Sequence, residues 1–507
     1  MQPTRKVSLR RQLNAYDTTS LVVGSAIGAD IFVIPSLIAA LIGPVSILIW
    51  LIGAVMAIVI AMCFAYCATI LPRVGGSYAY ARKVAGPFPG FMVGWALLLA
   101  EWFTLAVYPV AFTQYFETLV PNLTPLQVLA LKILFTATII LTNIIGVKIA
   151  GRFNDALTVA KLGPLLLLIC LGAAFIVLKP ATAVSHFQPF VTGPFSNVGQ
   201  VLVLIFWAYA GFELSSLPAD EIENPRKTLP RALLFGMLIV AAFYIITNFV
   251  VIALVHETAL GTSTAPLSLA AATALSFSPT LALIGGLILT FGALASILGV
   301  DESGTIGTSR LAFAMSIDGM LPRAFSKLHA SSKTPYVSII VLCATALIAS
   351  ITNSLSALIN ASVFLLSFVY LATSVSAYFL EKNHRPNEHK FQGTKLVIVL
   401  GIAFSILLMT QVNVGQVAIA LLLFVIGVPV YVLFAPKKEV TALKRDFLSR
   451  DAILERTYHQ GEVYLANVVR HVKRCVYRRK HIQDAWIISE EPRAHKNRRS
   501  GRPSRND

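Results

Sequence analysis

Within an otherwise apolar run the chain reads Gly24-Ser25-Ala26-Ile27-Gly28-Ala29-Asp30-Ile31-Phe32. This run places two glycines, which weaken a helix, next to a carboxylate that is costly to bury in a membrane. The stretch Trp207-Ala208-Tyr209-Ala210-Gly211-Phe212-Glu213 repeats the combination of glycine and acid far downstream. Two interrupted apolar segments in the two halves of a chain indicate the midplane binding site of a transporter.

The composition is that of a protein that crosses a membrane many times. The chain has 507 residues, of which 56% are hydrophobic and 13% are charged, whereas soluble domains carry about 25% charged residues. A spanning helix needs about 20 mostly apolar residues. Twelve such segments are predicted, at residues 18–42, 45–71, 90–118, 126–146, 155–178, 198–218, 231–255, 279–308, 336–352, 355–380, 395–412 and 414–435. The predicted fold is therefore an all-α membrane protein with twelve transmembrane helices.

The Lys and Arg residues are concentrated on one predicted side of the membrane. Of the 41 basic residues, 20 fall in alternate loops of residues 1–435 and 18 fall beyond residue 435. Cytoplasmic loops carry such an excess of basic residues. We therefore expect a multi-pass protein of the cytoplasmic membrane with both termini inside. Its predicted parts are a cytoplasmic N-terminus (1–17), a twelve-helix transporter domain (18–435) and a basic cytoplasmic tail (436–507).

The tail at 436–507 contains 18 basic and 9 acidic residues. The favoured interpretation is attraction to anionic lipid headgroups, and binding of RNA or protein is the alternative. Because the tail lacks the interleaved aromatic residues typical of nucleic-acid sites, no nucleic-acid partner is predicted. Cys63 and Cys67 lie four residues apart in an apolar segment with no nearby histidine. Packing is therefore favoured over ligation, and no metal or cofactor is expected.

Several motifs resemble those of one transporter family. The run at 24–32 looks like the glycine-rich first-helix motif of amino acid–polyamine–organocation transporters. Residues 206–213, followed by Glu-Ile-Glu-Asn-Pro-Arg-Lys-Thr-Leu-Pro-Arg-Ala at 221–232, are similar to the sixth-helix pattern of that family. The runs at 72–80 and 318–322 also match, and the resemblance covers about residues 15–435. It implies a LeuT-like inverted repeat of five plus five helices, with broken helices 1 and 6 and alternating access.

The resemblance also implies a substrate site at the two breaks. In the family the substrate carboxylate usually binds first-helix amides, here those of Ala26, Ile27, Gly28 and Ala29. The substrate amino group usually binds backbone carbonyls of the two breaks. The predicted substrate-binding residues are Ser25, Ala26, Ile27, Gly28, Ala29, Asp30, Phe206, Trp207, Ala210 and Gly211.

Asp30 departs from the family pattern, because most members have glycine at this position. A carboxylate here would repel a substrate carboxylate unless it is protonated, points away or binds an amine. Eukaryotic polyamine-uptake members place an acid at this position, and residues 107–112 and 298–302 faintly resemble that branch. Two substrate classes therefore stay open. One is an ordinary amino acid, and the other is a cationic amine with Asp30, Glu101 and Glu302 as counter-charges.

The remaining intramembrane charges allow more than one role each. Lys161 takes the place of a sodium ion in sodium-independent members, and it either couples transport to protons, braces the first break or reaches the headgroups. Glu213 matches an acid implicated in pH response, and capping of the half-helix backbone is the alternative. Glu101 has no clear partner in the sequence. Asp301 and Glu302 point about 100° apart on a helix, so only one readily faces the site.

The predicted function is secondary active transport of amino acids or related organic amines, as a proton symporter or an exchanger. The bundle of helices 1, 2, 6 and 7 would rock against the remaining scaffold. The alternatives are a polyamine or diamine transporter and a transport-inactive nutrient sensor of the same fold. An enzyme is disfavoured, because no HExxH, GxSxG or Walker pattern occurs in a suitable context.

Overall fold

The structure is a computed structural model that describes residues 14–71, 75–145, 147–214, 222–383, 393–412, 414–437 and 439–440. Contacts divide the chain into two units, Met1–Pro436 and Lys437–Asp507. All the described helices belong to the first unit. Residues 1–13 of the predicted N-terminal segment and the tail beyond residue 440 lie outside the described residues. The same is true of residues 72–74 and 221 of the quoted motifs and of residues 215–220 between them.

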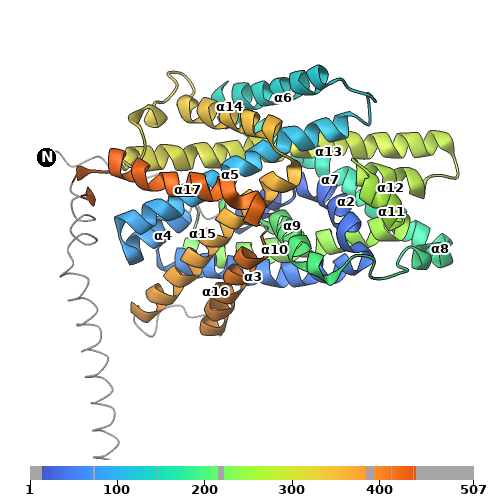
Figure 1. Ribbon diagram of the computed structural model, residues 1–507, viewed down its shortest axis with the longest axis horizontal. Helices are drawn as coiled ribbons and strands as arrows, with labels where there is room; N and C mark the ends of the chain where they lie inside the picture. The colour runs from blue at the N-terminus through green and yellow to red at the C-terminus, as the bar shows by residue number, and fades with distance from the viewer. Residues whose placement is uncertain are drawn as a thin grey trace, which may run out of the picture. The chain divides into compact units, whose positions relative to one another are not determined.

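The described part of the chain is all-helical (Figure 1). Its first half contains α1 (Ala15–Ala26), α2 (Asp30–Ile42), η1 (Gly43–Val45), α3 (Ser46–Ile70), α4 (Gly76–Ala85), α5 (Pro87–Phe116), α6 (Pro125–Ile145), α7 (Val147–Leu178) and α8 (Pro180–Ser185). Its second half contains η2 (Phe195–Asn197), α9 (Val198–Tyr209), α10 (Pro225–Leu254), α11 (Glu257–Thr262), α12 (Pro266–Ala274), α13 (Pro279–Ile317), η4 (Arg323–Ser326), α14 (Tyr336–Thr352), α15 (Leu355–Asn383), α16 (Thr394–Gln411) and α17 (Val414–Phe434). Most bounds agree with the predicted apolar segments within a few residues. Helices α7 and α10 begin earlier than predicted, α13 ends later, and α9 ends earlier, at Tyr209.

Local sequence explains where many of these helices begin and end. Proline occupies the first turn of α5, α10 and α13, where its missing N–H costs nothing. Asn14 caps α1 by accepting the N–H groups of Tyr16 and Asp17. Gly43, with a φ of 73°, ends α2 in a conformation that glycine adopts at little cost.

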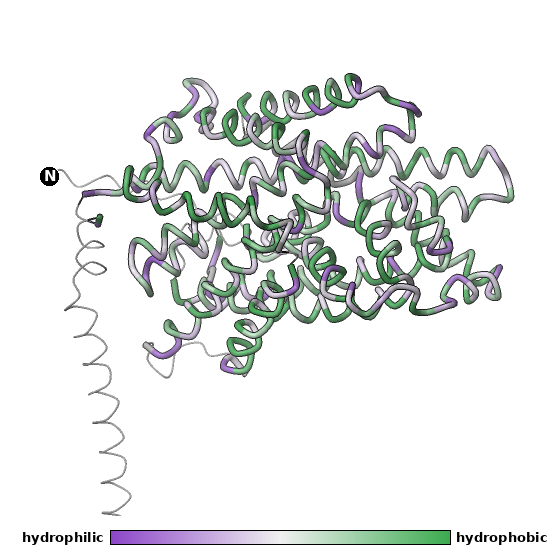
Figure 2. Tube along the Cα trace, in the orientation of Figure 1, coloured by the Kyte–Doolittle hydropathy of each residue, from purple (hydrophilic) through white to green (hydrophobic). Residues whose placement is uncertain are grey.

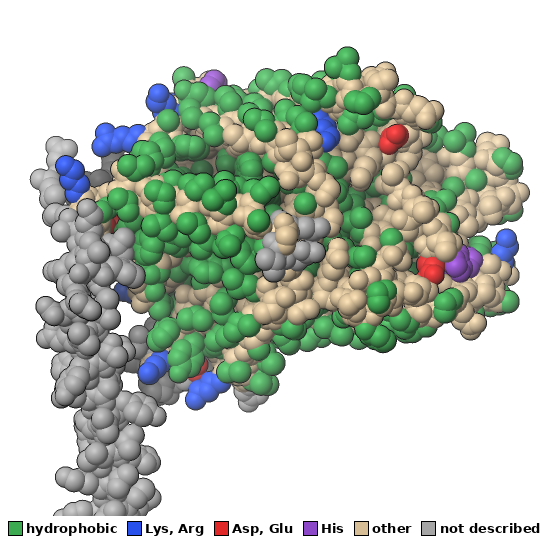
Figure 3. Space-filling view, in the orientation of Figure 1, with side chains coloured by type: hydrophobic (Ala, Val, Ile, Leu, Met, Phe, Trp, Pro, Cys, Tyr) green, Lys and Arg blue, Asp and Glu red, His purple; other side chains and the backbone are tan. Residues whose placement is uncertain are grey.

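Nine stretches of the described residues are long and apolar enough to cross a membrane. One of them, Asp30–Ile70, comprises α2, η1 and α3, and the shorter apolar helices Phe195–Tyr209 and Tyr336–Thr352 come in addition. Apolar residues run along most of the long helices, and polar residues gather toward their ends and in the connections (Figure 2). Hydrophobic side chains also cover much of the visible outer surface (Figure 3). The chain is therefore a multi-pass membrane protein.

The broken segments α1, α2 and α9 pack among the long helices, α1 on α10 and α9 on α2, α3, α15 and α16. In this arrangement α10 packs on α1 and α3, α13 packs on α5 and α7, and α15 packs on α3 and α5. The short helix α4 lies at one end of the first unit and α8, α11 and α12 lie at the other (Figure 1). All four helices fall in predicted loops, because hydropathy over about 20 residues does not detect short helices.

Two of the quoted motifs meet at the α4 end. Asp318, after α13, accepts hydrogen bonds from the Tyr78 hydroxyl at 2.7 Å and from Arg82 Nη1 at 2.8 Å. Burial and the Asp318 carboxylate raise the pKa of the Tyr78 hydroxyl well above its usual value. The network connects α4 to the end of α13, far along the chain.

Candidate functional site at the two helix breaks

The first break separates α1 from α2. Ile27 leaves the helix with φ −76° and ψ 102°, and α2 begins only at Asp30. Asp30 Oδ1 accepts the N–H of Gly28 at 2.8 Å. The Tyr244 hydroxyl lies within hydrogen-bonding distance of Asp30 Oδ2 and of the Ala26 carbonyl, and its single proton can be donated to either oxygen. Asp30 is 6% exposed. Its carboxylate therefore caps the break and occupies one of the amides predicted to hold a substrate carboxylate.

Lys161 of α7 binds the other side of the same break. Its Nζ donates to the carbonyls of Ile27 at 2.7 Å and Gly24 at 3.1 Å. These carbonyls lie at the C-terminal end of α1, where the helix dipole favours a cation. Lys161 is 2% exposed, which excludes the headgroup-reaching role among the three considered. The contacts brace the break, and they leave proton coupling as a prediction.

The second break, after α9, is built in the same way. Ala210 is extended and Gly211 has a φ of 108°. Both carboxylate oxygens of Glu213 accept the N–H of Gly211 at 3.0 Å, and the Tyr370 hydroxyl donates to Oε2 at 3.1 Å. Glu213 thus caps the backbone, as one of its two expected roles requires.

The two breaks touch each other. A Cβ on Gly211 would lie 2.5 Å from the Ser25 carbonyl oxygen and 3.5 Å from Ala26 Cα. Only glycine permits this approach, both for space and for its positive φ. The structure therefore brings the two predicted glycine-rich segments together, backbone against backbone.

One face of α5 lies against the second break. The carboxyl groups of Glu101 and Glu213 are hydrogen-bonded to each other. The Trp207 indole N–H donates to the Thr104 hydroxyl at 3.4 Å. The Tyr108 side chain lies close enough to Glu101, Glu213, Asp30 and Asp301 to interact electrostatically with all four. Residues 101, 104 and 108 share one helical face.

Helix α13 contacts the breaks through a different face from the one that carries Glu302. Ser296 donates to the Gly28 carbonyl at 3.1 Å, and a Cβ on Gly28 would meet Val300 at 2.8 Å. Glu302 instead accepts from Thr142 of α6 at 2.7 Å. The structure thus does not bring Glu302 to the breaks, whereas it brings Asp30 and Glu101 there.

A family comparison agrees with this arrangement of broken helices. A model of the family described as amino acid permease matches residues 13–435. The chain belongs to the amino acid permease family. It is thus an amino acid transporter of the amino acid–polyamine–organocation superfamily and not an enzyme.

Several named relatives resemble the permease over most of its length. The branched-chain amino acid permease BcaP of Bacillus subtilis (strain 168) is 27% identical, over 85% of this chain and 94% of its own. The serine/threonine exchanger SteT of the same organism is 27% identical, over 84% of this chain and 98% of its own. The methylthioribose transporter of that organism is 30% identical, over 66% of this chain and 73% of its own.

Two tyrosines that complete the breaks of the permease, Tyr244 and Tyr370, are not among the predicted site residues. Tyr244 packs edge-on against Trp50, with ring centroids 5.5 Å apart, and Tyr370 stacks on Phe212 at the same distance. Both tyrosines lie inside apolar spans, where a buried hydroxyl needs a partner. That requirement is a usable signal, but it does not identify the partner.

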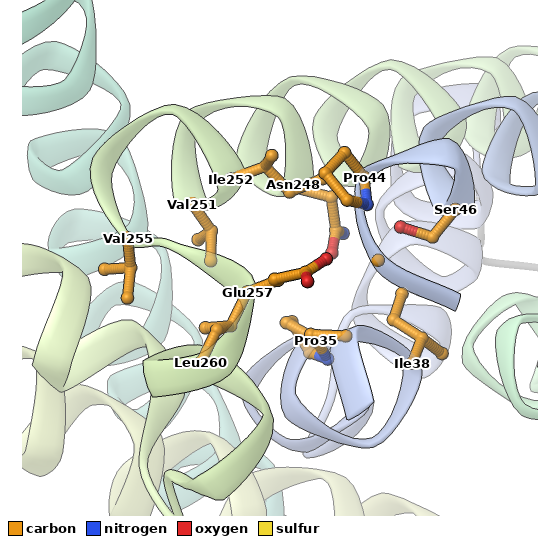
Figure 4. A pocket seen from close by; sticks show the side chains of 12 residues that line it. Pro35, Ile38, Pro44, Ser46, Asn248, Val251, Ile252, Val255, Glu257 and Leu260 are labelled. Atoms are coloured by element: carbon orange, nitrogen blue, oxygen red, sulfur yellow. The ribbon is translucent and has the colours of Figure 1, made fainter. Parts of the chain in front are cut away.

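A separate cavity of the permease lies at the end of α2 remote from Asp30. It leaves about 10 Å³ for the centre of a water molecule. Glu257 points into it between Asn248 and Pro35 (Figure 4). Glu257 Oε2 is buried and has no hydrogen-bond partner in the part of the chain that the structure describes. The cavity contains none of the predicted site residues.

Proposed function

We propose that the permease is a proton-linked symporter or exchanger of the cytoplasmic membrane that recognises its substrate by a protonated amino group. The observation that carries the proposal is the capture of the Gly28 N–H by Asp30. The Ile27 N–H also donates within the chain, to Val23. The N–H of Ala26 is engaged within α1, so three of the four amides predicted to bind a carboxylate are occupied, and the negative charge of Asp30 disfavours a second carboxylate there.

The amino group of the substrate has acidic and carbonyl partners at the breaks. We assign it to the carbonyls around Ser25, Phe206, Trp207 and Ala210 and to the carboxyl groups of Asp30 and Glu101. Glu213 and Lys161 are the proposed proton-coupling groups. Lys161 is bound to carbonyls of the first break, so a change in its charge would alter that break directly.

The proposed architecture has twelve transmembrane helices in an inverted repeat of five plus five. Dividing Asp30–Ile70 at η1 and adding the two shorter apolar helices to the nine long stretches supports the number twelve. The two breaks fall in the first and sixth of these helices, which supports the repeat. Most visible Lys and Arg side chains lie toward the α4 end, which supports a cytoplasmic α4 end and inside termini (Figure 3).

A polyamine or diamine is the second candidate substrate. It is favoured by the three carboxyl groups at the breaks that interact with Tyr108, those of Asp30, Glu101 and Glu213, because two of them can neutralise two ammonium groups. One relative is named as a transporter of methylthioribose, which is not an amino acid, so relatives of this chain include a protein named for another kind of substrate. A transport-inactive sensor is distinguished from both candidates by the absence of uptake.

Uptake by purified protein in liposomes tests the proposal. Neutral amino acids, cationic amino acids and putrescine are offered with and without a proton gradient. We expect uptake of a substrate with a protonated amino group, stimulated by the gradient or by an internal counter-substrate. Absence of any uptake, with binding retained, would favour the sensor.

Asp30→Asn and Asp30→Gly refine the substrate class. The asparagine variant keeps an acceptor for the Gly28 N–H and loses the charge, so uptake of a dication should fall at least about tenfold, since a charge pair at 4 Å contributes about 4 kcal/mol near a protein surface. The glycine variant frees the Gly28 N–H and should improve the affinity for neutral amino acids. Unchanged uptake of every substrate in both variants would contradict recognition by Asp30.

A further inference from the structure

Asp301 and Glu302 are consecutive acids buried in the middle of α13. They are 4% and 0% exposed. The ion pair found among the described residues joins Arg82 and Asp318 and includes neither acid. Two acids in one membrane segment are costly, and such residues mark ion or proton sites by default. The proposed substrate site does not use them.

The two carboxyl groups have incomplete sets of partners. Glu302 Oε2 accepts from the Thr142 hydroxyl at 2.7 Å, while its buried Oε1 has no hydrogen-bond partner within the described residues. Asp301 Oδ1 accepts from Thr305 at 3.4 Å. Neither acid receives enough donors to stabilise a full negative charge away from water.

Asp301 also lines a cavity between α5, α6 and α14. The cavity leaves about 10 Å³ for the centre of a water molecule, which is close to the minimum that a single water needs. Thr136 lines the same cavity, is 6% exposed, and has a buried hydroxyl with no partner among the described side chains. The remaining lining is apolar or weakly polar: Leu105, Pro109, Ile139, Cys343, Ala346 and Leu347. A water here would have Asp301 and Thr136 as its polar partners.

The two carboxyl groups must be neutralised by protons or by a bound cation. A hard cation needs several converging oxygen ligands. Asp301 and Glu302 point about 100° apart on the helix, and they contact different neighbours, so their oxygens do not converge. A proton needs only one carboxyl oxygen and one acceptor. The donor set therefore favours protons.

We propose that Asp301 and Glu302 form a proton-binding site in the scaffold, separate from the two breaks. A proton adds to a carboxylate oxygen of Asp301, and the resulting O–H donates to a water in the cavity or to Thr136. Release returns the proton to that water. Glu302 holds a second proton, and its Oε2 keeps the hydrogen bond from Thr142. No other reactant is required.

The site reaches the breaks through α5. The titratable groups that face Asp301 are Tyr108 of α5, Cys343 of α14 and Glu302 on its own helix. Tyr108 also interacts with Asp30, Glu101 and Glu213. The charge on Asp301 therefore changes the electrostatic environment of the substrate site without contact. This coupling rests on the proposed transport function, whereas proton binding itself does not.

Infrared difference spectroscopy of the full chain in liposomes tests proton binding without transport. The C=O band of protonated carboxylic acids is followed during a pH titration of the parent and of Asp301→Asn, Glu302→Gln and Thr136→Val. We expect each acid variant to lose one band, and Thr136→Val to shift the Asp301 band because a hydrogen-bond partner is removed. Glu117→Gln, at the exposed residue directly after α5, is the matched control and should leave these bands in place.

Transport is measured on the same samples. Asp301→Asn should lower proton-driven uptake about tenfold, within the usual range of coupling between sites, and leave exchange without a gradient within about twofold. Carboxylic acid bands that are identical in the parent and in all three variants would overturn the inference. If the bands change as expected but no variant or parent transports, the proposed function fails and the proton site stands. If Asp301→Asn does not fold, the Thr136→Val shift decides.

Discussion

The first and second helix breaks share one design and differ in one charge. In each, a glycine N–H is accepted by an acid two residues later, and a tyrosine hydroxyl from another helix lies within hydrogen-bonding distance of that acid. The first break adds Lys161, and the second adds Glu101. The acid that caps the first break thus has a lysine near it, whereas the acid that caps the second break has a second carboxyl group beside it.

This difference separates the roles of the two breaks. Lys161 binds the carbonyls at the end of α1 and interacts electrostatically with Asp30, so the first break contains charges of both signs. Two hydrogen-bonded carboxyl groups need a proton between them, because two carboxylates repel and neither can donate. We therefore expect the geometry of the second break to depend on a proton.

The largest effect is expected where the two breaks touch. Gly211→Ala places a Cβ against the Ser25 carbonyl and strains a φ of 108°, at a cost of about 1–3 kcal/mol for the backbone alone. Uptake in liposomes should fall to background, with a lower melting temperature. Gly24→Ala is the matched control, because a Cβ there meets nothing within 4 Å. Equal activities of the two variants would contradict direct contact between the breaks.

Removal of the Lys161 amino group should reduce uptake nearly as much as Gly211→Ala does. Lys161→Met leaves the carbonyls of Gly24 and Ile27 without their charged donor and removes the positive charge that interacts with Asp30, and a hydrogen bond from a charged group contributes about 1.5–3 kcal/mol. Both exchange and proton-driven uptake should be lost, and a combined Lys161→Met and Asp30→Asn variant should recover part of the melting temperature. The exposed Lys179→Met serves as the control. No recovery in the double variant would mean that the first break is not charge-compensated.

The smallest effect is expected at the second break. Glu101→Gln keeps a hydrogen bond to Glu213 and removes the need for a shared proton, so the fold should persist. Exchange should continue at saturating substrate with a weaker apparent affinity, because the Glu101 carboxyl group is assigned to the substrate amino group. The pH dependence of uptake should flatten, with a change of about tenfold at the pH where the parent varies most. The parent is measured beside the variant in liposomes of the same composition. An unaltered pH profile of uptake would contradict a role for the proton shared by Glu101 and Glu213.

Hydropathy was a good guide to the long helices and a poor one to the short ones. The segment predicted at 336–352 coincides with α14, and those at 45–71 and 395–412 agree with α3 and α16 within one residue at each end. Insertion of a long apolar run is a local property, so it can be recognised from sequence. Helices α11 and α12 fall in a predicted loop, because short helices are stabilised by packing rather than by their own length.

Some residues of the candidate site can be recognised from the sequence, and others cannot. The glycines and acids of both breaks stand out in the sequence because they are rare in apolar spans. Tyr244 and Tyr370 do not, since aromatic residues are common there. Glu302 was grouped with Asp30 and Glu101 by resemblance, yet it contacts Thr142 on the side of α13 away from the breaks.

The sequence by itself determined that the chain is a polytopic transporter with two broken helices. Membrane burial penalises every charge and every unpaired backbone group, so each exception is visible residue by residue. The tertiary structure alone decided the partners: Lys161 with the first break, Glu101 with the second, and the Asp301 cavity apart from both. The physical reason is that pairing of charges depends on distances of a few ångströms between segments far apart in the chain.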